Sequence, residues 1–307
     1  MALISRKKHL ITSLGFILLG LFGWTPVALS QDEPVSQPDI ILNAETLEQP
    51  VEVPPQTRGF QSARLDEYVE TDRNAYTFSS KTVGRGVKVF ESAYSYVKIG
   101  KQRSKQSAPE SLFRLGLTDR VEARLGYNFE TGRPSDTSEG DIITNFGINA
   151  QQQFFYGFKF QTTFRDENRR LIPESVFLIH GNTPVGSIEG QSQIRLGQSW
   201  SWELSNGWTL EQAVQFGTDR EEDDFYTLWA PSTVLRIPLD TEKRWFTQIE
   251  YFGVMSHNRR VEFSKQFIDT GLHYLITPHL EIGGYVAMGI NKQSRGALVN
   301  FGIGYRF

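Results

Sequence analysis

Ala297-Leu-Val-Asn-Phe-Gly-Ile-Gly-Tyr-Arg-Phe307, the last eleven residues of the chain, alternates between apolar side chains and mostly small or polar ones. The apolar set comprises Ala297, Val299, Phe301, Ile303, Tyr305 and Phe307. The other set includes Asn300 and Arg306. A period of two predicts a β-strand with one apolar and one polar face. We therefore expect an amphipathic terminal strand that ends on an aromatic residue.

The same alternation recurs in the upstream sequence, where polar turns separate short runs. It predicts twelve strands, at 87–98, 109–117, 121–130, 152–164, 172–182, 191–204, 208–218, 225–237, 244–255, 265–276, 280–290 and 297–307. A strand of about ten tilted residues spans an apolar band of about 25 Å. The pattern predicts an all-β fold, a single transmembrane antiparallel barrel of about 12 strands.

The predicted connections differ between the two ends of this barrel. One set is mostly tight, and the other set is mostly longer and charged, at 99–108, 131–151, 183–190, 219–224, 256–264 and 291–296. Tight turns at one end and long loops at the other are typical of outer-membrane barrels. A soluble β-sandwich or a lipocalin-like barrel is the alternative. Pro231 lies inside one predicted strand and predicts a bulge there.

The sequence before the barrel divides into two further parts. Residues 1–30 carry Arg6, Lys7 and Lys8 before an apolar run and predict a secretory signal peptide. Residues 31–80 are acidic and rich in proline early on, and predict a flexible periplasmic or plug segment. The barrel then occupies residues 81–307. Removing the leader takes three of the 32 basic residues and none of the 35 acidic ones, which leaves 29 against 35 and argues against nucleic acid as a partner.

The cost of placing charge in lipid decides which face of each strand points outward. An Arg or Lys facing lipid at the midplane costs about 2–4 kcal/mol. We therefore expect the charged phase to line the lumen, where some of its members form a constriction. The candidates are Arg114, Glu122, Arg124, Lys159, Arg195, Glu203, Glu211, Arg236, Glu250, Asp269, His273 and Glu281.

Several motifs resemble those of the family named "putative MetA-pathway of phenol degradation". They are Glu70-Thr-Asp-Arg73, Thr82-Val-Gly-Arg-Gly86, Glu91-Ser-Ala-Tyr-Ser-Tyr96, the run from Pro109 to Gly126, Asn182-Thr-Pro-Val-Gly186, Asp269 to Leu280, and the terminal Phe301 to Phe307. The resemblance covers about residues 70–307 and implies an outer-membrane transporter for small, hydrophobic or aromatic solutes. Asn74-Ala75 departs from the Pro-Asp usual after the first motif.

Two groups of residues receive specific roles from this interpretation. Glu70, Asp72 and Arg73 precede the first strand and are candidates for fixing a plug inside the barrel through charge-assisted hydrogen bonds. Phe301, Ile303, Tyr305 and Phe307 resemble the C-terminal assembly signal of outer-membrane barrels. The implied location is the outer membrane of a Gram-negative-type bacterium, reached through the secretory pathway.

The alternatives to a channel are a structural or surface-interaction barrel and, less favoured, a barrel hydrolase acting on lipid or peptide. Arg259 and Arg260 suit lipopolysaccharide phosphates in the second class. Ser256 and His257 are adjacent in sequence, which does not suit a nucleophile and its base. The chain has no cysteine, no metal-ligand spacing and no phosphate-binding glycine loop, so we expect no enzyme activity, metal or cofactor. Expected partners are outer-membrane lipids, lipopolysaccharide, the barrel-assembly machinery and an unidentified small solute.

Overall fold

The computed structural model describes residues 68–73, 75–99, 103–132, 152–166, 169–185, 192–204, 207–221, 224–294 and 296–307. The predicted signal peptide 1–30, most of the predicted segment 31–80 and the stretch 141–151 lie outside these residues. All of the described residues belong to one compact unit.

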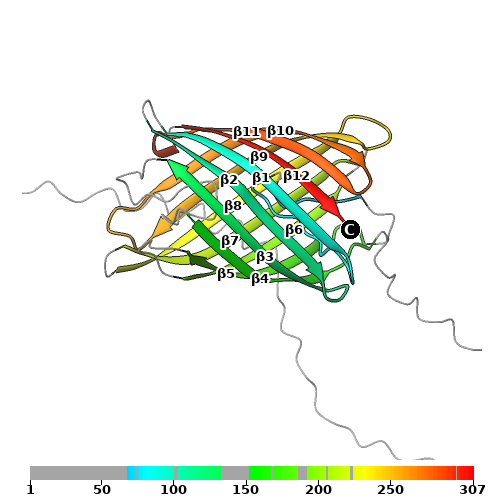
Figure 1. Cartoon of the computed structure of the whole chain (residues 1–307), viewed down its shortest axis with the longest axis horizontal. Helices are drawn as coiled ribbons and strands as arrows, with labels where there is room; N and C mark the ends of the chain where they lie inside the picture. Colours follow the sequence, from blue (N-terminus) through cyan, green and yellow to red (C-terminus); the bar gives the residue numbers. More distant parts are fainter. Residues whose placement is uncertain are drawn as a thin grey trace, which may run out of the picture. The chain divides into compact units, whose positions relative to one another are not determined.

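Twelve antiparallel strands form a closed barrel (Figure 1). They are β1 (Lys88–Ile99), β2 (Arg103–Gly116), β3 (Val121–Gly132), β4 (Gln152–Thr163), β5 (Glu174–Pro184), β6 (Gln193–Glu203), β7 (Thr209–Glu221), β8 (Asp224–Pro238), β9 (Trp245–His257), β10 (Ser264–Thr277), β11 (Leu280–Gly289) and β12 (Gly296–Arg306). Each strand pairs with its sequence neighbours, and β1 closes the barrel on β12, with Val89 opposite Arg306 and Ile99 opposite Gly296. The predicted fold class and strand number are confirmed.

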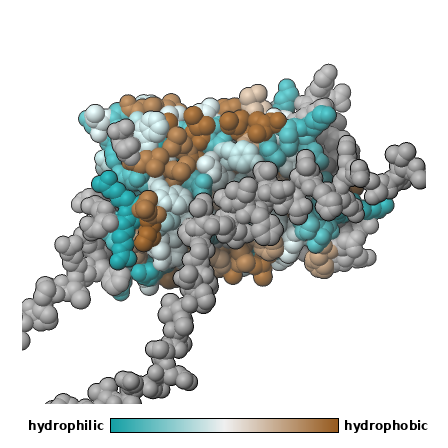
Figure 2. Space-filling model, turned by 180° about the vertical axis from the view of Figure 1, so that it is seen from behind, coloured by the Kyte–Doolittle hydropathy of each residue, from teal (hydrophilic) through white to brown (hydrophobic). Residues whose placement is uncertain are grey.

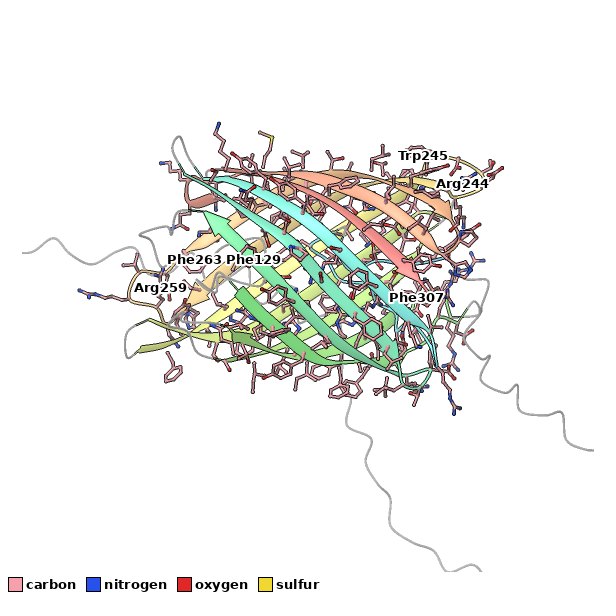
Figure 3. The ribbon with its side chains drawn as sticks, viewed as in Figure 1. Phe129, Arg244, Trp245, Arg259, Phe263 and Phe307 are labelled. Atoms are coloured by element: carbon pink, nitrogen blue, oxygen red, sulfur yellow. The ribbon has the colours of Figure 1, made fainter. Side chains whose placement is uncertain are left out.

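Side chains alternate across the barrel wall as the terminal stretch predicted. In β12 and at the residue after it, Phe301, Ile303, Tyr305 and Phe307 are exposed, and Phe307 is 65% exposed. Asn300 and Arg306, on the opposite face, are buried. The outer surface therefore carries apolar side chains, visible as brown areas in Figure 2. Trp245 and Phe307 lie on this surface at one end of the barrel (Figure 3).

The two ends of the barrel differ in their connections, although less regularly than predicted. We call the end with Phe307 the turn end and the opposite end the loop end. Two expected loops at the loop end are short, because β2 begins at Arg103 instead of 109 and β7 and β8 extend to Glu221 and Asp224. These strands continue past the apolar band with polar residues. Because such residues lack the apolar alternation, the sequence pattern assigns them to loops. At the turn end, residues 164–173 form a longer connection than those between the neighbouring pairs of strands.

The prediction of a bulge at Pro231 is wrong. Between β8 and β9, Trp229 pairs with Met255 and Ser232 pairs with Phe252, so the register is the same on both sides of the proline. On its other edge Pro231 keeps its place opposite Val214. The pairing of β8 with β9 is thus interrupted between Trp229 and Ser232, but no extra residue is inserted and no bulge forms.

Apart from one 3-10 residue at Gly207, helical structure in the described ranges is limited to a short 3-10 turn, η2 (Lys292–Ser294), before β12. Within the same ranges we find no helix whose length and apolarity would suffice to cross a membrane.

The outward position of Val286 allows a direct test of which face meets lipid. Val286 lies within β11 and is 48% exposed. Val286→Arg should destabilise the folded barrel by about 2–4 kcal/mol, because the guanidinium would face hydrocarbon. The same change at Ile290, beyond the end of β11, should cost about 0–1 kcal/mol. Guanidinium unfolding of both variants in lipid vesicles measures the difference, and equal costs would contradict the assigned face.

Candidate functional site

Residues 68–87, which we call the luminal segment, enter the barrel and return to the end where they began. Near one end of the segment the Val69 amide donates to Pro278 O at 2.8 Å, and near the other the Gly86 amide donates to Gly116 O at 2.8 Å. Pro278 and Gly116 both lie at the turn end. Between these points Thr77 is completely buried. The segment is therefore a re-entrant loop that fills part of the lumen.

Small hydroxyl side chains let the segment pack against the wall. Thr77 Oγ1 donates to Ser232 Oγ of β8 at 2.8 Å. Ser80 Oγ lies 2.6 Å from Ser199 Oγ of β6. Ser79 Oγ donates to Glu70 Oε1 at 2.6 Å, which ties the two limbs of the segment together. These contacts bring a chain with no strand partner close to the barrel on several sides.

Carboxylates of the wall accept the backbone N–H groups of the segment. Glu91 Oε2 accepts the amides of Asp72 at 2.8 Å and Arg73 at 3.0 Å. Glu250 accepts the amides of Tyr76 at 2.9 Å and Thr77 at 2.6 Å. Glu122 Oε2 likewise accepts the Val83 amide at 3.0 Å. Buried amides need acceptors, and hydrogen bonds to a charged acceptor are stronger than neutral ones.

Asp72 lies at the centre of a buried ion network. Lys159 Nζ donates to Asp72 Oδ2 at 2.8 Å, and Arg124 Nη1 donates to the same oxygen. Arg114 Nη1 lies 3.7 Å from Asp72 Oδ1 and also contacts Glu91 at 3.0 Å. The Asp72 side chain is 2% exposed. Three wall cations thus compensate one carboxylate of the luminal segment.

Burial and nearby cations act in opposite directions on the acids of the segment. Burial raises the pKa of Asp72, but Arg114, Lys159 and Arg124 outweigh it and hold that pKa well below its usual range. For Glu70, burial is opposed by Lys81 and Arg236, and the result is a pKa lowered to about 2. Both carboxylates are therefore ionised at neutral pH.

Arg73 extends from the segment to strands β2, β3 and β4, the same part of the wall that surrounds Asp72. Its Nη2 donates to Ser111 O at 2.8 Å and to Asn128 Oδ1 at 3.2 Å. Its guanidinium lies 5.0 Å from the centroid of the Phe155 ring and 3.8 Å from Glu110 Oε2. The predicted plug motif of Glu70, Asp72 and Arg73 therefore lies inside the barrel and contacts its wall.

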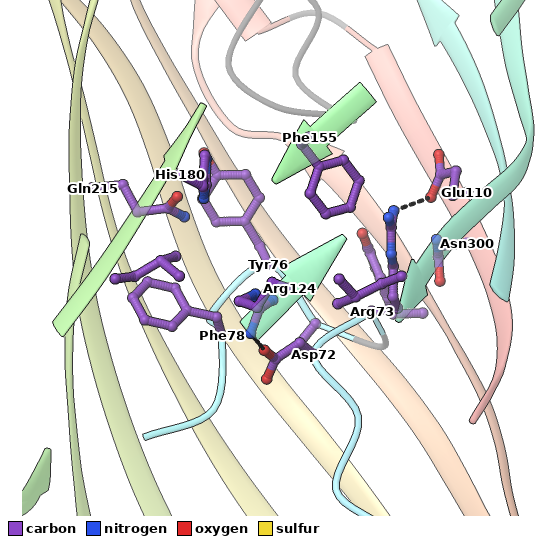
Figure 4. A pocket seen from close by; sticks show the side chains of 14 residues that line it. Asp72, Arg73, Tyr76, Phe78, Glu110, Arg124, Phe155, His180, Gln215 and Asn300 are labelled. Carbon is purple, nitrogen blue, oxygen red and sulfur yellow. Dashed lines mark hydrogen bonds and ion pairs between the residues drawn. The ribbon is translucent and has the colours of Figure 1, made fainter. Parts of the chain in front are cut away.

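A cavity of about 110 Å³ adjoins the tip of the luminal segment (Figure 4). Its lining combines rings with polar groups and includes Tyr76, Phe78, Phe155, Tyr285, His180 and Asn300. The Tyr76 ring stacks on Phe252 at 4.3 Å, and Phe78 packs among Val176, Leu178 and Ala213. The tip is thus held by aromatic packing in addition to Glu250.

The structure places most of the predicted lumen residues inside the barrel. Those that are buried are Arg114, Glu122, Arg124, Lys159, Arg195, Glu211, Glu250, Asp269, His273 and Glu281. Four of them share the network around Asp72, namely Arg114, Glu122, Arg124 and Lys159. Arg236 donates to Glu211 at 3.0 Å, and His273 contacts Glu281 and Gln248 at 3.2 Å each. The proposed constriction role of these residues remains a prediction.

Two of the residues singled out in the sequence lie elsewhere than expected. Glu203 is exposed at the turn end and pairs with Arg165, because it is the last residue of β6. Arg259 is 8% exposed, and its guanidinium lies over the rings of Tyr226 and Phe263. It therefore does not face outward as the lipopolysaccharide hypothesis requires, whereas Arg260 is exposed.

Several residues of the site were not identified from the sequence. Glu91 lies in the family-like motif, but its strand carries apolar residues on both faces, which concealed its orientation. Tyr76, Phe155 and Tyr285 are aromatic residues whose inward position depends on register. The alternation in β4 gave the signal for Phe155, which lies opposite in phase to the exposed Phe154.

The described residues do not assemble a hydrolytic site around His257. Ser256 Oγ accepts the amide of Phe263 at 2.8 Å, and His257 Nδ1 lies 3.3 Å from Glu262 on the exposed surface. Asp269 receives a hydrogen bond from Gln248 Nε2 at 3.3 Å. Across the described ranges, no group of three or more His, Asp or Glu side chains is arranged to hold a metal ion.

Removing the central negative charge should release the luminal segment. Asp72→Asn leaves buried cations without their shared partner, which should weaken docking of the segment by about 3–5 kcal/mol. Lys81→Gln is the control, because the Lys81–Glu70 pair is partly exposed and should contribute about 0–1 kcal/mol. Hydrogen exchange of the amides of residues 75–83, followed by mass spectrometry, measures both. Similar exchange in the two variants would contradict the central role of Asp72.

Docking of the segment should also depend on pH in the acid range. Since the pKa values of Glu70 and Asp72 are lowered in the docked state, their contribution is present above about pH 4.5, the ordinary range of carboxylic acids. It should decline as the pH falls toward about 2, the pKa of Glu70. Protection factors corrected for intrinsic exchange, measured between these limits, test this sign. Docking that strengthens on acidification would contradict it.

Comparison with known proteins supports the fold and assigns the family. An outer-membrane channel from Pseudomonas putida F1 superimposes with a TM-score of 0.52 at 10% identity, covering 78% of this chain and 100% of that one. The NanC porin superimposes with a TM-score of 0.51 at 8% identity, covering 70% of this chain and 98% of that one. No curated protein sequence matches the chain. The family model described as "Putative MetA-pathway of phenol degradation" matches residues 71–307, from the luminal segment to the last residue, and the chain belongs to that family.

Proposed function

We propose that this protein is an outer-membrane channel for small, hydrophobic or aromatic solutes, and that the luminal segment closes it. The proposal rests on the type of hydrogen bond that holds the segment against the wall. Between residues 70 and 83, every described hydrogen bond from the segment to the wall uses a side chain on one partner or both. Such contacts can be exchanged without breaking a strand ladder. The segment is thus suited to leave the lumen and return.

The location follows from the fold and the sequence together. The barrel has the outward apolar surface of a membrane protein, and its fold resembles that of outer-membrane channels. The turn end, where the luminal segment begins and ends, would face the periplasm. Export through the secretory pathway rests on the predicted signal peptide at 1–30.

The solute class is supported by the family and by the cavity. The family description names phenol degradation. The cavity at the tip of the segment offers the rings of Tyr76, Phe155 and Tyr285. A barrel without transport is the second candidate, favoured by the dense ion network that fixes the segment across the lumen. We assign no catalytic role to the described residues.

A reversible cross-link tests whether the segment gates the channel. Ser80 and Ser199 have hydroxyl oxygens 2.6 Å apart, and the chain contains no cysteine of its own. The double variant Ser80→Cys with Ser199→Cys should form a disulfide that fixes the segment to β6. In planar bilayers the oxidised protein should show no channel openings, and a reductant should restore them. Each single-cysteine variant should behave as the parent protein in both conditions.

Deletion of residues 31–80 gives the complementary measurement. It removes most of the luminal segment and should raise single-channel conductance well above that of the full chain. Conductance that is unaffected both by the deletion and by the cross-link would contradict gating by the segment. Absence of conductance in every form would favour the barrel without transport.

A further inference from the structure

The cavity beside the tip of the luminal segment has aromatic walls from separate parts of the chain. Tyr76 and Phe78 come from the segment and Phe155 comes from β4 (Figure 4). Tyr285 comes from β11. Each is anchored by a further contact, such as the Tyr76–Phe252 stack at 4.3 Å and the Arg73 guanidinium over Phe155 at 5.0 Å. Rings held in this way present flat apolar surfaces that favour another ring. The volume of about 110 Å³ is of the order that holds one six-membered ring, since an apolar cavity of about 150 Å³ takes up benzene.

The acidic and guanidinium groups of the cavity lining cancel. Asp72 and Glu110 supply two carboxylates, and Arg73 and Arg124 supply two guanidinium groups. These groups already pair with one another, Arg124 with Asp72 and Arg73 with Glu110 at 3.8 Å. A charged solute would have to compete with one of these buried pairs and would lose its own hydration. The lining therefore favours an uncharged molecule.

The buried atoms of the lining that have no hydrogen-bond partner among the residues that the structure describes include two acceptor oxygens and the His180 Nε2 atom. The amide of Asn300 is oriented by its Nδ2, which donates to Ser95 Oγ at 2.8 Å and leaves Oδ1 without a donor. Glu110 Oε1 also has no partner, and each of these residues is only 3% exposed. Buried acceptors without donors are costly and uncommon in folded proteins. These two oxygens have almost no accessible surface, so a molecule that enters the cavity would remove that cost by donating a hydrogen bond after a small shift of the Asn300 or Glu110 side chain.

We propose that this cavity is a binding site for a small, uncharged aromatic molecule that carries a hydrogen-bond donor, such as a ring hydroxyl. The rings of Tyr76, Phe155 and Tyr285 contact its faces, and Asn300 Oδ1 and Glu110 Oε1 accept its hydrogen bond. The inference rests on the proposed channel function, because the solute must reach the lumen. It adds that the same side chains hold both the solute and the tip of the segment. Because Tyr76 of the segment is part of the site, binding favours the docked position of the segment.

Calorimetric titration of the full mature chain in detergent micelles tests this site, with phenol as the probe and empty micelles as the blank. We expect saturable binding of phenol, and binding at least tenfold weaker for benzene, which lacks the donor, and for benzoate, which carries a charge. Heat equal to that of the blank would overturn the proposal. Benzoate or benzene binding as tightly as phenol would overturn the assigned solute class.

Two variants at neighbouring positions form a matched pair for the same titration. Phe155→Leu removes a ring from the cavity, whereas Phe154→Leu makes the same change on the outer surface, where Phe154 is 42% exposed. Phenol should bind at least tenfold more weakly to the first and unchanged to the second. Equal affinities would overturn the site. Asn300→Leu should reduce the preference for phenol over benzene, and an unchanged preference would contradict the role of Asn300.

The binding and conductance measurements separate this inference from the proposed function. A protein that conducts ions in bilayers but gives no saturable phenol binding refutes the site and leaves the channel. A protein that binds phenol with the expected order of affinities but never conducts refutes the channel and leaves the site.

Discussion

The arrangement of this protein depends on a requirement for hydrogen-bond acceptors inside the lumen. Strand backbones satisfy one another around a closed barrel, so the wall has no free ladder to offer a segment that enters it. The luminal segment must find side-chain acceptors instead. Glu91, Glu122 and Glu250 supply them, and the negative charge they bring is compensated by cations such as Arg114. The presence of so many charged side chains in the lumen is thus largely explained by the luminal segment that they hold.

This requirement also gives the segment two unlike anchors. Around Asp72 the contacts are ionic and buried, so loss of one partner leaves charge uncompensated in a poorly hydrated place. At the tip the contacts are two amides on Glu250 and the ring of Tyr76 on Phe252. The cavity lies beside the second anchor, where a neutral solute meets rings and unpartnered acceptors without disturbing the ion pairs.

The strands were predictable from sequence because every second residue in a membrane barrel meets lipid. Phe301, Ile303 and Tyr305 show this period clearly, and most of the twelve strands followed from it, whereas β1 carries apolar residues on both faces. The ends of β2 and β7 were missed because polar residues beyond the apolar band lose that period. The inward placement of the charged phase followed from the cost of charge in lipid. Which acid accepts which amide depends on the path of residues 68–87, and that path has no periodic signal in the sequence.

The glycines at the junction with β1 have a consequence for how the barrel and its segment are connected. Gly84 and Gly86 have φ angles of 81° and 78°, and a Cβ added to Gly116 would lie 1.6 Å from Gly84 O. The chain therefore reverses sharply there and passes close to the wall. Because the segment begins and ends at one mouth, it can be drawn out without threading past the strands, and it stays tethered by a few residues to β1. A tether this short keeps the local concentration of the segment at the mouth in the millimolar range or above. If the segment gates the channel as proposed, its reclosure is a first-order event within one molecule, with a rate independent of how many copies the membrane holds.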